Sequence, residues 1–93
     1  MNPEDYKAPP PPTMPLSELS HLLKSGDAAV YRAVYGLIDD YKSILLEHFG
    51  PADKSAPGLS LVDMAKHRHW TDAQTHALLN LSLEALRRAI DKK

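Results

Sequence analysis

The spacing of apolar residues predicts a short helix at the start of the folded part of the chain. Leu16, Leu19, Leu22 and Leu23 lie three or four positions apart, as expected for one face of a helix, and Ser17 is the expected cap. Gly26 supplies a stop signal after them. The sequence therefore predicts a short first helix that ends at about Gly26.

A second, long helix is predicted over residues 28–49. Asp27 is a good N-cap, no proline interrupts this stretch, and Gly50 and Pro51 follow it. One apolar row comprises Val30, Val34, Leu37, Tyr41 and Ile44. A second row beside it comprises Tyr31, Tyr35, Ile38, Leu45 and Phe49. Gly36 is the weak point of this prediction, since glycine costs about 1 kcal/mol relative to alanine inside a helix.

Two more helices are predicted after an exposed connection over residues 51–58. Ser60 with Asp63 indicates the start of a short helix that ends near Arg68. Thr71 with Gln74 forms a capping box, so a long helix is expected from there to about residue 91. No stretch alternates apolar and polar residues as a strand does. The predicted fold is thus all-α, a small bundle of about four helices, two short and two long, whose long helices pack antiparallel.

The first 15 residues differ from the rest because they are rich in proline. Pro9 to Pro12 form an uninterrupted run, which disfavours helix, so we expect a disordered tail over residues 1–15 and a single domain over residues 16–93. Such a run can dock in an aromatic-lined groove as a polyproline helix. It lacks a basic residue at the usual spacing, which favours a plain solubilising tail.

Composition narrows the classes of function. The 93 residues include 11 Lys plus Arg and 12 Asp plus Glu, and no cysteine, so the net charge of −1 gives no overall attraction for nucleic acid. Residues 59–93 are mildly basic. No apolar run approaches the roughly 18 residues that span a bilayer, and no secretion signal is evident. We therefore expect a cytoplasmic protein without a membrane partner.

Motifs for catalysis and cofactor binding are absent from the sequence, which contains neither a phosphate-binding glycine loop nor a nucleophile elbow. We expect neither an enzyme nor a bound cofactor. His67, His69 and His76 cluster around Asp72, but their spacing matches no strong metal signature, so no metal site is predicted. Whether this histidine cluster binds metal or responds to pH remains open at this point.

Residues 60–81 resemble a helix-turn-helix unit, with a turn over residues 67–70 between two helices. DNA-binding versions commonly have glycine in that turn, where this chain has His69. A DNA-binding regulator is therefore the alternative hypothesis, and an ordinary helical corner is favoured. The residues that would face the DNA are Arg68, Thr71, Gln74, Thr75 and His76.

The surplus of apolar residues on the long helix leads to the favoured hypothesis. A two-helix core needs one apolar face from each helix, and the second row provides more than that. We expect a non-catalytic helical protein–protein interaction module, acting as a regulator, adaptor or inhibitor, that binds another protein or forms a homodimer. The predicted interface is Tyr31, Tyr35, Ile38, Leu45 and Phe49. The alternative is that the short helices cover this row within a monomer.

Overall fold

A computed structural model describes residues 14–91, and these residues form α-helices joined by loops and turns, with no β-strand. The prediction of an all-α fold is confirmed. Most of the predicted disordered tail, residues 1–13, and the last two residues lie outside the described part. The five helices are α1 (Leu16–Ser25), α2 (Ala28–Tyr35), α3 (Asp39–Phe49), α4 (Leu61–Arg68) and α5 (Asp72–Asp91).

The single long helix predicted over residues 28–49 was wrong, because the chain breaks there into α2 and α3. Gly36 ends α2, its N–H donating to Ala33 only three residues back, and Ile38 is extended with ψ 155°. Asp39 and Asp40 then occupy the first turn of α3, where negative charge favours the start of a helix. The fold therefore has five helices rather than about four.

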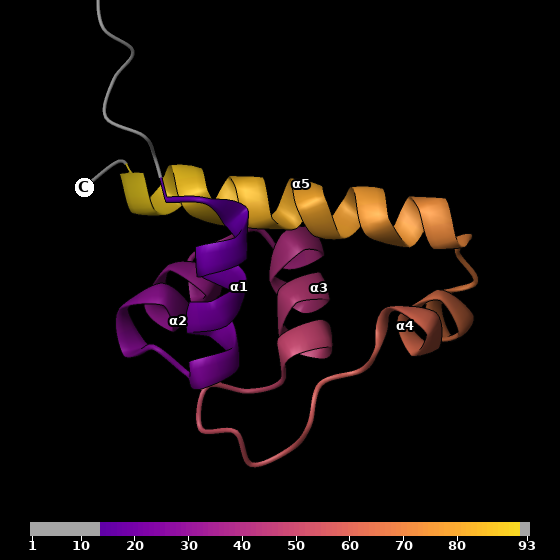
Figure 1. Ribbon diagram of the computed structural model, residues 1–93, viewed down its shortest axis with the longest axis horizontal. Helices are drawn as coiled ribbons and strands as arrows, with labels where there is room; N and C mark the ends of the chain where they lie inside the picture. The colour runs from indigo at the N-terminus through magenta and orange to yellow at the C-terminus, as the bar shows by residue number, and fades with distance from the viewer. Residues whose placement is uncertain (1–13, 92–93) are drawn as a thin grey trace, which may run out of the picture.

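Helix α5 is the centre of the arrangement, since it packs against all four other helices. In Figure 1 it lies along the top of the molecule, with α1, α2 and α3 beneath it and α4 below its N-terminal end. Helices α1 and α3 run across α5 rather than along it. The predicted antiparallel pair of long helices was therefore also wrong, because the break at Gly36 lets α3 turn across α5.

Most of the predicted helix caps are confirmed. Asp27 accepts a hydrogen bond from the Val30 N–H at 3.0 Å, and Ser60 accepts one from Asp63 at 3.1 Å. Thr71 and Gln74 form the predicted reciprocal capping box, at 2.9 and 3.0 Å. Ser17 was the wrong cap for α1, because Pro15 occupies the cap position, two residues earlier. The Pro15 carbonyl accepts from the N–H groups of Glu18 and Leu19.

A single hydrophobic core joins the five helices. Its least exposed members come from every helix and include the leucines at 19, 23 and 86, Val34 and Met64, none of which has measurable exposure. On α5 the inward positions follow the helical repeat: Thr75, Leu79, Ser82, Leu83 and Leu86. The hydroxyl groups of the two polar residues, Thr75 and Ser82, each donate a hydrogen bond to the carbonyl oxygen four residues earlier, so neither is buried without a partner. Residues on the opposite side of α5, such as Leu81, are exposed.

The connection between α3 and α4 is held against the helix ends by Lys54. Its ammonium group donates to the carbonyl oxygens of Leu23 and Phe49 and to the Tyr31 hydroxyl, the last two at 2.9 and 2.8 Å. These carbonyls belong to the final turns of α1 and α3, which carry partial negative charge. In the same loop, the Ser55 N–H donates to Asp53 and holds the pKa of that exposed carboxyl below its ordinary value.

Candidate functional site

The structure divides the predicted interface residues into a buried and an exposed group. Tyr31, Leu45 and Phe49 lie in the core of the single chain, with at most 8% of each residue exposed. Tyr35 and Ile38 are 52% and 62% exposed. The second apolar row is thus covered within the monomer for the most part, and only Tyr35 and Ile38 of the predicted set are accessible to a partner.

Tyr31 is buried because its hydroxyl group has polar partners in the core. The oxygen lies 3.1 Å from the Leu23 carbonyl and 3.0 Å from the Gly50 carbonyl, and it accepts from Lys54. A buried tyrosine needs such partners, since an unpaired hydroxyl would be costly to bury. Tyr31 therefore links α2 to the C-terminal ends of α1 and α3, and it is not accessible to a binding partner.

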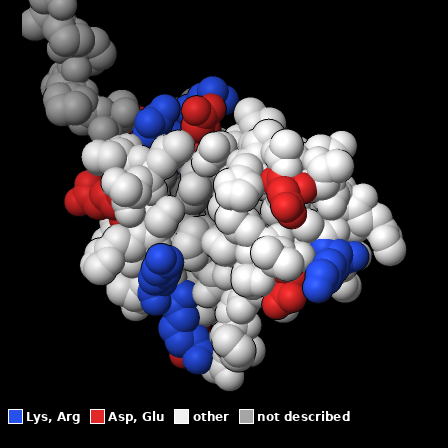
Figure 2. Space-filling model, turned by 45° about the vertical axis from the view of Figure 1, so that its right-hand side comes forward, with Lys and Arg blue, Asp and Glu red and all other residues white. Residues whose placement is uncertain are grey.

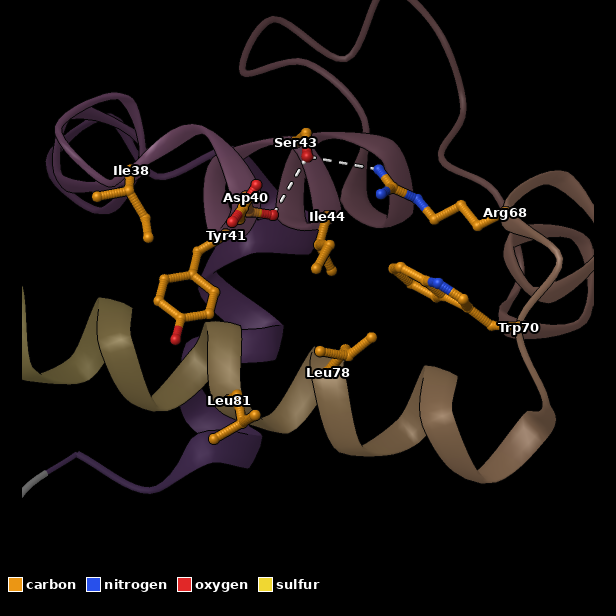
Figure 3. A pocket seen from close by; sticks show the side chains of 9 residues that line it. All are labelled: Ile38, Asp40, Tyr41, Ser43, Ile44, Arg68, Trp70, Leu78 and Leu81. Carbon is orange, nitrogen blue, oxygen red and sulfur yellow. Dashed lines mark hydrogen bonds between the residues drawn. The ribbon is translucent and has the colours of Figure 1, made fainter.

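A hollow of about 340 Å³ opens between α3, the turn before α5, and α5 itself. Its lining is mainly apolar: Ile38, Tyr41, Ile44, Trp70, Leu78 and Leu81, with polar atoms from Asp40, Ser43 and Arg68. In Figure 3 the rings of Tyr41 and Trp70 stand on the two sides of the hollow, with Ile44 and Leu78 between them. We call this the aromatic hollow.

Two strongly exposed apolar side chains belong to the aromatic hollow. Ile38, just before α3, is 62% exposed, and Leu81, on α5, is 48% exposed. Isolated exposed leucines are common on protein surfaces, but a cluster of apolar side chains around one depression is typical of a binding site. The aromatic hollow is therefore the candidate functional site.

Arg68 fixes the wall of the aromatic hollow through an ion pair with α3. Its guanidinium donates two hydrogen bonds to the Glu47 carboxylate, at 3.1 and 3.0 Å, and both side chains are only about one-fifth exposed. The same guanidinium lies 4.9 Å from the centre of the Trp70 ring. Bidentate pairing and stacking of this kind hold a planar group firmly, so Trp70 is positioned before any ligand arrives.

Sequence reasoning missed most of the aromatic hollow. Trp70 was assigned to a turn between two helices. The available signal was that the chain has a single tryptophan and that it directly precedes a capping box. Nothing local, however, links Ile38 to Leu81, which are brought together only by the break at Gly36.

The residues of the DNA-binding hypothesis lie around the corner between α4 and α5, but several have other roles. Arg68 is paired with Glu47, Thr75 is 1% exposed, and Thr71 and Gln74 cap α5. His76 is exposed and its Nδ1 lies 3.0 Å from the Asp72 carbonyl oxygen. The face in Figure 2 shows both signs of charge interspersed around an uncharged centre, rather than a basic stripe. DNA binding stays a prediction.

His69, in the turn between α4 and α5, has a left-handed backbone conformation, which glycine adopts more readily than other residues. His69 adopts the left-handed conformation, with φ 58° and ψ 40°, at the position where DNA-binding versions commonly have glycine.

The histidine cluster does not assemble: within residues 14–91, no three side chains of His, Asp or Glu are placed to share a metal ion.

Comparison with known proteins returned no match, whether to family models, to curated proteins or to solved structures. Of the helices in residues 14–91, none is both long and apolar enough to span a membrane.

Proposed function

We propose that this chain is a non-catalytic helical protein–protein interaction module, a regulator or adaptor, that binds its partner at the aromatic hollow. The observation that carries the proposal is the pairing of two exposed apolar side chains, Ile38 and Leu81, around a depression walled by Tyr41 and Trp70. Tyrosine, tryptophan and arginine are the residue types most enriched at the energetic centres of interfaces.

The small number of exposed apolar groups at the aromatic hollow favours self-association over binding of a different protein. Fully burying an isoleucine or leucine side chain is worth about 1.5–3 kcal/mol, so two half-exposed ones contribute roughly 2–3 kcal/mol. Association costs at least about 4 kcal/mol in lost motion. A symmetric dimer makes every contact twice, which offsets this cost with the surface that one chain provides. We therefore propose a weak homodimer that uses the aromatic hollow.

The proposal is tested by following the NMR signals of the full chain on dilution from about 200 to 5 µM. The indole N–H of Trp70 gives a unique signal, because the chain has one tryptophan. We expect this signal and the amides of Ile38 and Leu81 to shift, while Val62, equally apolar and 56% exposed on α4, stays constant. Shifts confined to α4, or shifts only in residues outside the hollow, would contradict the proposed surface.

A further inference from the structure

The lining of the aromatic hollow suggests the chemistry of its ligand. An indole and a phenol ring stand on either side of a shallow apolar floor formed by Ile44 and Leu78. Proline-rich segments in the polyproline II conformation dock in such aromatic-lined grooves, where tryptophan and tyrosine also supply donors to proline carbonyls. A proline run binds at low entropic cost, since each ring fixes φ in advance.

This chain carries such a segment itself, at Pro9 to Pro12. The proline rings of this run and the mainly apolar lining of the hollow are complementary surfaces. We propose that the aromatic hollow binds the Pro9–Pro12 segment of a second copy of this chain, an inference that rests on the proposed interaction function.

The geometry of α5 indicates why the segment would come from a second copy. Met14, where the described chain begins, lines a different hollow together with Ile90 and Val30. Leu81 precedes Ile90 by nine residues, which is about 2.5 turns and roughly 14 Å along the helix, so the two side chains lie on opposite flanks of α5. A tail starting at Met14 must therefore pass around a helix about 10–12 Å wide to reach Leu81.

The proline run is too close to Met14 for that path. Pro12 and Pro9 precede Met14 by two and five residues, which at about 3.1 Å per residue is a reach of roughly 6–16 Å. The path from Met14 to Leu81 covers roughly 14 Å along α5 and also passes around the helix, so it is longer than this reach. The tail of a second copy avoids the path around α5 when that copy places its own Met14 within this reach of the hollow, and two chains arranged in this way exchange tails and fill both hollows at once.

The test uses the fluorescence of Trp70 in the full-length chain, where it reports on the hollow alone. The variant replaces Pro9, Pro10, Pro11 and Pro12 with serine, and Pro3→Ser, a proline outside the run, is the matched control. We expect the emission of the unmodified chain and of the control to shift to shorter wavelength as the concentration rises from about 5 to 200 µM. The four-proline variant should keep one spectrum throughout.

A synthetic peptide of residues 1–13 completes the experiment. Added to the four-proline variant, it should restore the shift in a saturable manner, and a peptide with serine at the four positions should not. A shift that depends on the prolines but not on concentration would overturn the second-copy source in favour of the same chain. No shift in any sample would overturn the whole inference. A concentration-dependent shift in the four-proline variant would retain the hollow as an interaction surface and reject the tail as its ligand.

Discussion

Lys54 joins the ends of two helices through one ammonium group. Its three donors meet the Leu23 and Phe49 carbonyls and the Tyr31 hydroxyl, and its ammonium lies 5.0 Å from the centre of the Tyr31 ring. Although much of the residue is exposed, these hydrogen bonds are partly buried. Lys54 also has a left-handed backbone, with φ 59°, which a lysine adopts only when its surroundings hold it. The long loop is therefore fixed at its centre.

Replacing this lysine tests that role. In Lys54→Met the stem keeps its packing but the carbonyls at the ends of α1 and α3 lose their donor, so we expect a loss of about 1–3 kcal/mol in unfolding free energy. Thermal denaturation followed by circular dichroism measures it, and Lys66→Met, an exposed lysine in the last turn of α4, is the control. Equal melting temperatures for the two variants would contradict the account.

Sequence patterns reveal local interactions between residues but not those between distant parts of the chain. The sequence identified Asp27, Ser60, Thr71 and Gln74 as capping residues because each motif is local. Lys54 contacts residues that precede it by 31 and 23 positions, and nothing in the loop sequence indicates this. Tyr31 was likewise assigned to an outer surface, since helical spacing alone does not say which of two rows is buried.

Among the elements, the boundary between α2 and α3 determines the shape of the candidate site. The sequence marked Gly36 as a weak point but predicted a continuous helix, because no proline interrupts the stretch. The break is favoured by three features together: the glycine, the acidic first turn of α3 and the packing of Leu37 against the core. The third is a long-range effect, which is why periodicity could not reveal it.

Replacing two of the glycines with alanine should have opposite effects on stability. Gly36 has an ordinary negative φ, and an added Cβ would be 3.5 Å from its nearest neighbour, so Gly36→Ala should be neutral or stabilise by about 0.4–1 kcal/mol. Gly58 lies against α3, where an added Cβ would overlap the carbonyl oxygen of His48. Gly58→Ala should destabilise by more than about 2 kcal/mol. Urea unfolding compares the pair, and a stabilised Gly58→Ala would contradict the loop packing.

For the molecule as a whole, the fold class followed from composition and helical spacing, while the arrangement did not. Four helices pack against α5, and the aromatic hollow combines Ile38, Trp70 and Leu81 from three separate parts of the chain. A site of this kind depends on how the elements cross, which the sequence does not encode locally. The predicted interface therefore shares with the hollow only Ile38.

At this scale the central claim is that the aromatic hollow joins two copies of the chain. Leu81→Asp places a charge on the hollow, and Val62→Asp places the same charge on a similarly exposed site of α4, so both should fold alike.

The most direct measurement is the solution mass of the unmodified chain and these two variants, by light scattering after size exclusion at about 5–200 µM. We predict that the unmodified chain and Val62→Asp approach twice the 10.3 kDa of one chain, and that Leu81→Asp stays at 10.3 kDa. A chain that remains at 10.3 kDa throughout, or a dimer that Leu81→Asp leaves intact, would contradict the account.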